Sequence, residues 1–258
     1  MWRSFVAMGD SFTEGLDDPY PDGTYRCWAD LVAARLAIDV GPGFGYANLA
    51  VRGRLFNQVV AEQLPATLAM RPDLVSFAAG GNDVLRRKAD PAGLVAQLDR
   101  VVGELRAAGA DVILFRFADV FSHLPVQRIV GPRAAVINEG AREVAARHGA
   151  YLIDLFADEV FHNPVMWSAD RLHMSPAGHR RVAAHVLTTL GVGVDEEWLL
   201  MPPAPAPTPW LLARRADLQW AGRHLAPWLK RRLAGTSSGD MVTAKRPRLS
   251  SVDRSLTR

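Results

Sequence analysis

Along the first 190 residues, short apolar runs alternate with longer segments whose apolar side chains recur every three or four positions. The apolar runs predict five buried strands, at residues 4–8, 46–50, 73–78, 112–115 and 151–153. The longer segments predict helices at residues 27–36, 55–70, 91–108, 133–147 and 176–190. Pro65 is expected to kink or interrupt the second helix, because proline lacks an amide hydrogen. This alternation predicts an α/β fold with three layers, in which helices cover both faces of a five-stranded parallel sheet.

The character of the chain changes near residue 201. Five prolines between residues 201 and 209 predict an extended linker. Residues 210–234 place leucine and tryptophan on one side of a helix and most arginines elsewhere, so they predict an amphipathic basic helix with a kink at Pro227. Ser, Gly, Thr, Lys and Arg dominate residues 235–258 and predict a disordered end. Residues 1–200 are therefore expected to form the main domain.

Charge is distributed unevenly along the chain. Residues 1–200 hold 19 Lys and Arg against 24 Asp and Glu, and residues 201–258 hold 11 against 3. An acidic body (net −5) is thus followed by a basic extension (net +8). The extension is expected to contact an acidic surface, which is its own body, a membrane or a polyanion. The basic residues are few and no aromatic platform accompanies them, so a nucleic-acid partner is not favoured.

Composition indicates the class of protein and its cellular compartment. Hydrophobic residues make up 49% and charged residues 22%, as in ordinary globular proteins. Cys27 is the only cysteine, which rules out an intramolecular disulfide and fits a reducing compartment. The first apolar stretch is too short for a signal peptide, and no run of about 18 apolar residues occurs. These observations lead us to expect a cytoplasmic protein.

Polar residues and glycines follow the first three predicted strands. Ser11 follows the first strand at a strand-to-helix turn, where backbone N–H groups and the helix dipole favour an anion, as an acyl-transfer nucleophile requires. Gly53 follows the second strand and can bring its N–H close to a substrate oxygen. Asn82 follows the third strand and offers an amide donor to an oxyanion. Taken singly, each of these is more often an ordinary turn residue.

The last group precedes the final helix of the body. Asp170 and His173 are three residues apart, so the carboxylate can accept from one ring nitrogen and fix the tautomer. The other nitrogen can then take a proton from a serine. No cluster of Cys and His has zinc spacing, so we expect no metal and no cofactor. His179 and His185 are six apart on a helix and are interpreted as surface or packing residues.

Together these four groups resemble the SGNH (GDSL) hydrolases over about residues 4–190. The matching motifs are Gly9-Asp10-Ser11, Gly53, Gly80-Gly81-Asn82-Asp83 and Asp170-Arg171-Leu172-His173. The resemblance implies a flavodoxin-like SGNH fold and metal-free ester hydrolysis. It implies Ser11 as nucleophile, His173 as base and Asp170 as its orienting partner, with an oxyanion hole made by the Ser11 and Gly53 amides and the Asn82 side chain. Phe12 replaces the leucine of the family's name, and the residues after 200 lie outside the pattern.

The resemblance leaves the substrate open. The family includes thioesterases, lysophospholipases and carbohydrate acetyl esterases. Apolar residues between 120 and 130 follow the fourth strand and favour short- to medium-chain acyl esters. A second reading is that the chain is an interaction or membrane-surface protein that acts through its basic helix. Residues 210–234 would then dock on the body, associate with a second copy or bind a membrane, and docking on protein is favoured.

Overall fold

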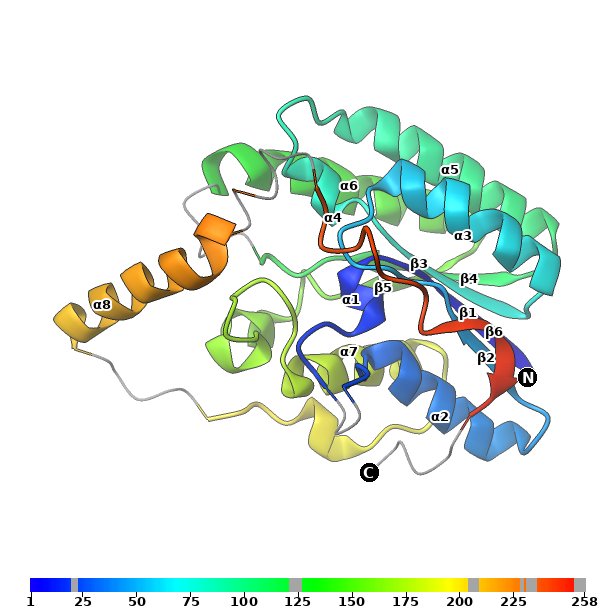
Figure 1. The fold of residues 1–258 in the computed structure, drawn as a ribbon. Helices are drawn as coiled ribbons and strands as arrows, with labels where there is room; N and C mark the ends of the chain where they lie inside the picture. The colour runs from blue at the N-terminus through cyan, green and yellow to red at the C-terminus, as the bar shows by residue number, and fades with distance from the viewer. Residues whose placement is uncertain (20–22, 121–126, 204–208, 228–229, 231–235, 253–258) are drawn as a thin grey trace.

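The fold is described from a computed structural model, in which residues 1–19, 23–120, 127–203, 209–227, 230 and 236–252 are placed well enough to describe. Its centre is a six-stranded sheet in the order β5-β4-β3-β1-β2-β6 (Figure 1). The strands are β1 (Ser4–Gly9), β2 (Gly45–Asn48), β3 (Leu74–Ala78), β4 (Asp111–Arg116), β5 (Tyr151–Asp154) and β6 (Arg246–Ser251). Strands β1 to β5 pair in parallel, and β6 pairs antiparallel to β2.

Helices cover both faces of this sheet, as the alternating pattern predicts (Figure 1). One face carries α2 (Trp28–Val40) and α7 (Pro176–Thr189), and the other carries α3 (Phe56–Met70), α5 (Pro91–Ala107) and α6 (Gln127–His148). Two short helices, α1 (Ser11–Glu14) and α4 (Gly81–Val84), follow β1 and β3. Single turns of 3-10 helix lie at Glu159–His162, Pro164–Met166 and Glu196–Leu199. The α/β architecture is confirmed.

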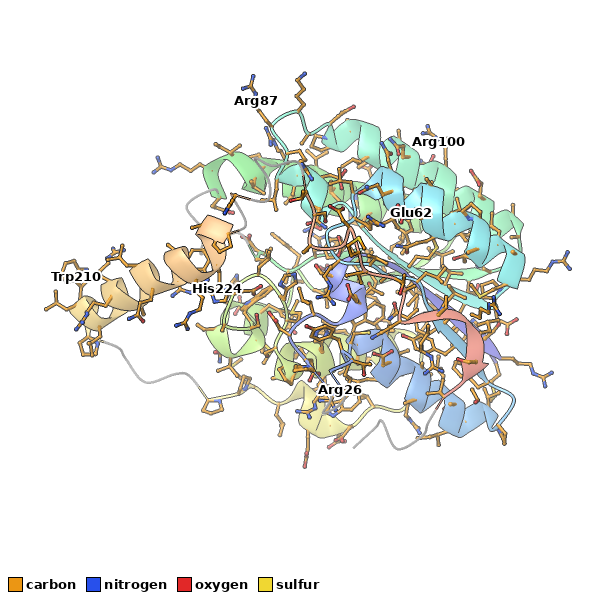
Figure 2. The ribbon with its side chains drawn as sticks, in the orientation of Figure 1. Arg26, Glu62, Arg87, Arg100, Trp210 and His224 are labelled. Carbon is orange, nitrogen blue, oxygen red and sulfur yellow. The ribbon has the colours of Figure 1, made fainter. Side chains whose placement is uncertain are left out.

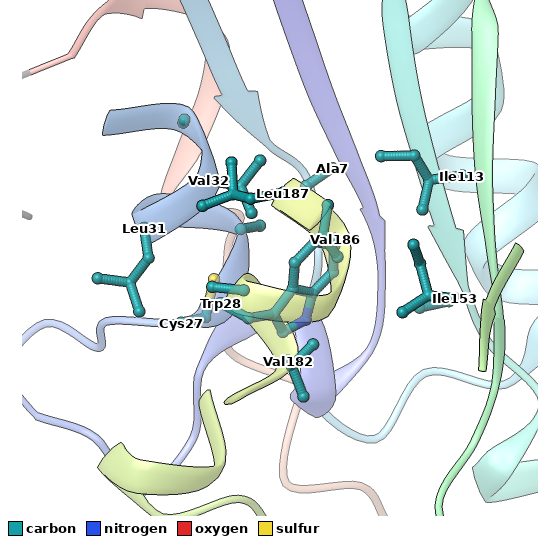
Figure 3. Packing of buried hydrophobic residues seen from close by; sticks show 14 of the residues in the cluster. Ala7, Cys27, Trp28, Leu31, Val32, Ile113, Ile153, Val182, Val186 and Leu187 are labelled. Carbon is teal, nitrogen blue, oxygen red and sulfur yellow. The ribbon is translucent and has the colours of Figure 1, made fainter. Parts of the chain in front are cut away.

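Each face of the sheet has its own apolar core. Trp28 on α2 is fully buried and packs with Val182 and Val186 of α7 beneath the sheet (Figure 3). A buried aromatic ring of this size removes about 200 Å² from water, which favours folding by up to about 5 kcal/mol, and the buried, unpaired Trp28 Nε1 offsets part of this. His179 of α7 is 1% exposed and accepts from the Trp28 backbone N–H at 3.4 Å, so it is a packing residue. These two cores fix the positions of the loops that leave the strands.

The prediction of five strands is wrong, because the chain returns to the sheet after the predicted linker and helix. Residues 246–251, which we expected to be disordered, form β6 along the outer edge of β2. The segment is polar, but an edge strand needs only backbone hydrogen bonds to its neighbour and apolar side chains on the face that packs against the core. Leu249 is the apolar side chain on this face: it packs on the second core and contacts Gly45. Residues 253–258 lie outside the described residues.

The helix expected at residues 210–234 is described in part. Helix α8 spans Trp210–Trp220 and continues into a π-helical turn at Ala221–Leu225, before Pro227. Trp210 lies at its outer tip and His224 closer to the sheet (Figure 2). Residues 204–208 of the predicted linker and 228–229 and 231–235 of the predicted helix are outside the description. In the described part of the chain, no helix combines the length and apolar character needed to cross a membrane.

Other predicted elements shift by a few residues. Helix α3 runs through Pro65 without interruption. Helix α6 begins at Gln127, before the expected start at 133, and contains Pro132 near its N-terminus. Pro132 lies beyond the first turn, so it gives up the bond that an N–H at this position would donate to the carbonyl oxygen of Arg128. Strands β1, β2 and β3 end within two residues of their predicted ends, so the loops that carry the candidate site begin where the sequence predicts.

Candidate active site

Ser11 begins α1 directly after β1. Asp10 caps this helix by accepting from the Phe12 backbone N–H at 3.2 Å. The preceding Gly9 has φ +154°, and a Cβ there would lie 2.5 Å from the Ala78 carbonyl oxygen of β3. Only glycine allows the two strands to approach so closely at this turn. The turn thus presents the Ser11 hydroxyl at the carboxyl end of the sheet.

His173 brings Ser11 and Asp170 together. Its Nε2 lies 2.9 Å from Ser11 Oγ, and its Nδ1 lies 2.5 Å from Asp170 Oδ2. Asp170 Oδ1 accepts from the backbone N–H groups of Leu172 and His173, both at 2.9 Å, and from the Ser168 hydroxyl at 2.7 Å. These bonds fix the carboxylate from one side while the ring binds it from the other.

Asp170 stays ionised in this setting. Burial alone would favour its neutral form, but the hydrogen bonds and charge of His173 outweigh burial and hold the pKa of Asp170 well below its ordinary value. An ionised carboxylate at Nδ1 keeps the proton on that nitrogen and leaves Nε2 to accept from Ser11. The geometry is that of a nucleophile, a base and an orienting group.

Asn82 lies beside Asp10, on the short helix α4. Its Nδ2 donates to Asp10 Oδ2 and to the Arg54 carbonyl oxygen, each at 3.1 Å. Asp10 is buried, and burial raises the pKa of its carboxyl to about 7, partly opposed by the Phe12 N–H and by His173. Donation to an oxyanion would require one N–H of Asn82 to be shared with its present acceptor. The sequence placed Asn82 in this site but did not indicate that Asp10 holds it.

Gly53 lies in the loop after β2, next to α1. Glu14, the last residue of α1, accepts from the backbone N–H of Arg52 at 2.6 Å and forms an ion pair with the Arg52 guanidinium. The loop that carries Gly53 is therefore fixed to the helix that carries Ser11. Ser237, far along the chain, lies against Gly53. The structure thus joins Ser11, His173 and Asp170 directly and places Asn82 against Asp10, whereas Gly53 is linked to the site only through its neighbours in the loop.

An apolar cavity of about 340 Å³ opens beside Ser11 and His173. Its walls include Phe117, Val120, Ala134, Ile137, Phe156 and Trp167. Polar groups reach it from Asp10, Asn82, Asp119, Gln127 and Asn138. Val120 and Gln127 come from the segment that the sequence proposed as a cleft wall, and residues 121–126 of that segment lie outside the described residues.

The only potential metal ligands that gather in the described part of the chain belong to this same site. Asp17, Asp170 and His173 offer ligand atoms within 4.8 Å of one another. Ser168 Oγ lies 2.7 Å from both carboxylates, and His173 Nδ1 already pairs with Asp170. The three side chains are thus engaged in hydrogen bonds within the site.

Two side chains of the C-terminal extension also contact the site. Trp220 Nε1 donates to the Asp170 carbonyl oxygen at 2.9 Å. Arg171 forms an ion pair with Asp217 at 2.9 Å, and its guanidinium lies over the Trp220 ring. The sequence predicted that the extension contacts an acidic surface or another protein, but no local pattern could indicate that it reaches the loop of Asp170 and His173.

Serine, histidine and aspartate gathered at the carboxyl end of parallel strands form the arrangement that is found in serine hydrolases. The sequence profile of the GDSL-like Lipase/Acylhydrolase family matches residues 7–181. The chain belongs to this family, as the four motifs predicted. No curated protein matches the chain significantly.

Solved structures agree with this assignment. TesA is 30% identical to this chain, with a TM-score of 0.58, and the match covers 72% of this chain and 97% of TesA. LAE5, an alpha/beta hydrolase enzyme from the metagenome of Lake Arreo, Spain, is 23% identical with a TM-score of 0.61, covering 73% and 95%. Axe2, an acetylxylan esterase from Geobacillus stearothermophilus, is 21% identical with a TM-score of 0.59, covering 80% and 97%. The last two show a common fold.

Proposed function

We propose that the chain is a serine esterase that cleaves carboxylic esters through an acyl-enzyme. Ser11 Oγ attacks the ester carbonyl while His173 Nε2 takes its proton, and Asp170 stabilises the ring cation that forms. His173 then protonates the departing alcohol. Water, activated by His173, then attacks the acyl-enzyme, which releases the acid and restores Ser11. The observation that carries this proposal is the 2.9 Å contact between His173 Nε2 and Ser11 Oγ, backed by the 2.5 Å contact to Asp170.

The oxyanion of the tetrahedral intermediate would lie between the backbone amides of Ser11 and Gly53 and the side chain of Asn82. The fixed separation of α1 and the Gly53 loop supports this assignment, because preorganised donors lose little free energy at the moment of reaction. Glu14 maintains that separation through Arg52.

The acyl group would occupy the apolar cavity beside Ser11. Its walls are mainly aromatic and aliphatic, and its volume of about 340 Å³ lies at the small end of typical ligand sites. This supports a short- to medium-chain acyl group over a sugar, which would require more polar walls.

Hydrolysis of p-nitrophenyl esters from acetate to palmitate tests the proposal, with Ser11→Ala as the matched control. We expect activity that peaks at an intermediate chain length and disappears in Ser11→Ala. Equal hydrolysis by both proteins would refute the serine mechanism. Activity confined to acetate would instead favour an acetyl ester, such as an acetylated carbohydrate, and would refute the assignment of the cavity to a longer acyl chain.

A further inference from the structure

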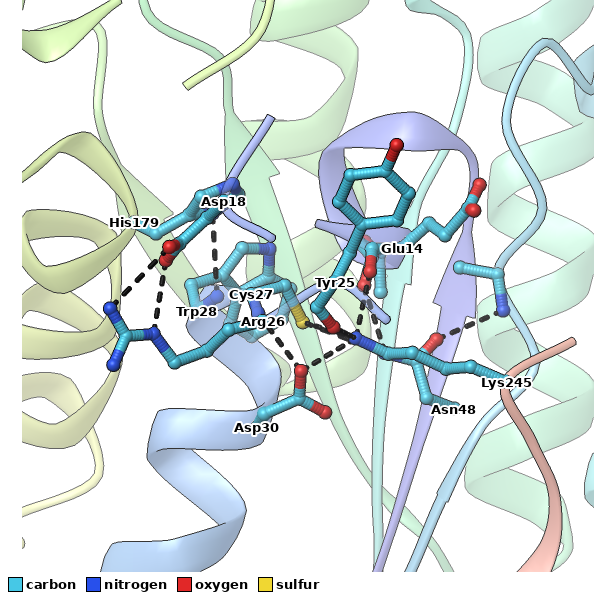
Figure 4. Close-up of polar contacts among 12 residues, drawn as sticks. Glu14, Asp18, Tyr25, Arg26, Cys27, Trp28, Asp30, Asn48, His179 and Lys245 are labelled. Carbon is cyan, nitrogen blue, oxygen red and sulfur yellow. Dashed lines mark hydrogen bonds and ion pairs between the residues drawn. The ribbon is translucent and has the colours of Figure 1, made fainter. Parts of the chain in front are cut away.

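A buried ammonium group joins the C-terminal segment to the nucleophile turn. Lys245, just before β6, donates from Nζ to the carbonyl oxygens of Glu14 at 2.7 Å and Tyr25 at 2.9 Å, and to Asp30 Oδ2 at 2.5 Å (Figure 4). Its side chain is 16% exposed. Lysine is seldom buried unless it is paired, and here three oxygen acceptors match its three N–H donors, with Cys27 Sγ at 3.6 Å as a fourth, weaker contact.

The surroundings keep this group charged. Burial alone would lower the pKa of Lys245, but the Asp30 carboxylate outweighs burial and raises it. Asp30 is itself held by the Cys27 backbone N–H and by the Tyr46 hydroxyl, both at 2.9 Å. The ammonium therefore sits in a rigid polar network below the active site.

This network holds the end of the helix that begins with Ser11. Helix α1 has four residues, and its last carbonyl groups lack partners within the helix. Asn48 Nδ2 donates to the Thr13 carbonyl oxygen at 2.8 Å, and Lys245 donates to that of Glu14. A cation at a helix C-terminus also interacts favourably with the helix dipole. Lys245 thus fixes the backbone of Glu14, whose side chain binds Arg52.

A second part of the same segment lies on the loop of Gly53. Ser237 Oγ donates to the Gly53 carbonyl oxygen at 3.4 Å and accepts from the Gly239 N–H at 3.2 Å. Gly239 lies so near that a Cβ there would be 1.9 Å from the Arg52 carbonyl oxygen. One segment, residues 237–245, therefore touches both the Gly53 loop and the helix of Ser11. It lies beyond residues 7–181, which match the family.

We propose that Lys245 is a positioning residue that holds the turn of Ser11 and the loop of Gly53 at the separation needed for ester cleavage. The proposal rests on the proposed function. It assigns residues 237–245 a role in supporting the active site of this chain, although they touch no reacting atom. Lys245 acts through Glu14, and Glu14 acts through Arg52.

The test compares Lys245→Met, which keeps the aliphatic stem and removes the charge, with Arg248→Met, which changes an exposed residue of the adjoining strand β6. We expect Lys245→Met to lower kcat for p-nitrophenyl butyrate by at least about tenfold, because a displacement of about 1 Å can cost about a hundredfold. KM should change by less than about threefold, since the cavity for the acyl chain lies elsewhere. Arg248→Met should match the wild type in both constants. Circular dichroism at the assay temperature checks that each variant is folded.

A fluorophosphonate probe separates failure of this proposal from failure of the proposed function. Ser11 Oγ would attack phosphorus, fluoride would leave, and His173 would take the proton, whatever ester the enzyme prefers. A wild-type chain that is not labelled would contradict the proposed function. A wild type and a Lys245→Met variant that are labelled equally fast, with kcat within about twofold, would overturn the role of Lys245 alone.

Glu14→Gln provides the test if Lys245→Met does not fold. This change keeps the carbonyl that Lys245 binds but weakens the link to Arg52. We expect kcat to fall with little change in KM, and slower labelling of Ser11. Wild-type kcat in a folded Glu14→Gln variant would overturn the proposal.

Discussion

The buried carboxyl of Asp10 makes the stability of the fold depend on pH in an unusual direction. In the unfolded chain an aspartate has a pKa of about 3.9, and burial raises the pKa of Asp10 to about 7. A raised acid pKa means that the folded state favours the neutral form. The stabilisation is therefore complete below the unfolded pKa and is lost as pH rises towards 7.

The size of the effect follows from the shift. About three pKa units correspond to about 4 kcal/mol, of which about 3 kcal/mol should be lost between pH 4.5 and pH 8. Asp10→Asn removes the titration while keeping the shape of the side chain. The difference in unfolding free energy between this variant and the wild type should therefore move by about 3 kcal/mol in favour of the variant over that range. Any constant offset from altered hydrogen bonds cancels in this comparison.

Urea unfolding followed by tryptophan fluorescence at several pH values measures this difference. Asp39→Asn, at an exposed aspartate on α2, is the matched control and should show a much smaller change. A difference between Asp10→Asn and the wild type that stays constant within about 0.5 kcal/mol from pH 4.5 to 8 would refute the argument, because a group that does not titrate in this range contributes no slope.

Three further predictions concern other residues. Asn82→Ala should lower kcat for p-nitrophenyl esters by about a hundredfold or more, if its amide serves the oxyanion, and near-wild-type turnover would rule that role out. Ala134→Phe should shift the preferred acyl chain to shorter esters, because Ala134 lines the cavity, and an unchanged chain-length profile would place the acyl group elsewhere. Burial lowers the pKa of His179 to about 3, so its contribution to stability is present above about pH 6.5 and is lost as pH falls. His179→Gln should therefore lose about 2 kcal/mol less than the wild type between pH 6.5 and 4.5 in urea unfolding, and equal losses would contradict this account.

The parts of this fold that follow a local pattern could be predicted from the sequence. Each of the five parallel strands is an apolar run, because both of its faces are covered by helices. Ser11, Asn82 and the pair Asp170 and His173 follow strands or precede a helix, so the geometry of a parallel sheet brings them to one edge. The order of the motifs and the resemblance to the family therefore predicted that they lie together, but the order gave no contact between their side chains.

The C-terminal contributions could not be found in this way. Leu249 is the one apolar side chain that β6 turns inward, so the segment reads as a polar tail. Lys245 pairs with Asp30 and Glu14 across 215 and 231 positions of sequence. No periodicity links residues so far apart, and a lysine in a basic stretch is usually solvated. Charge balance did indicate that the extension contacts an acidic surface, but it left its own body, a membrane and a polyanion as alternatives.

Strand β6 also forms the edge of the sheet at which another chain could pair. Without it, β2 would be an edge with unpaired N–H and C=O groups, which can template pairing with a second molecule. With it, the outermost strand contains Pro247, which lacks an N–H, beside the exposed Arg248. Proline and charge are the features that block strand addition at natural sheet edges. Deleting this segment would therefore expose an aggregation-prone edge as well as remove Lys245, which makes single substitutions the cleaner way to study its role.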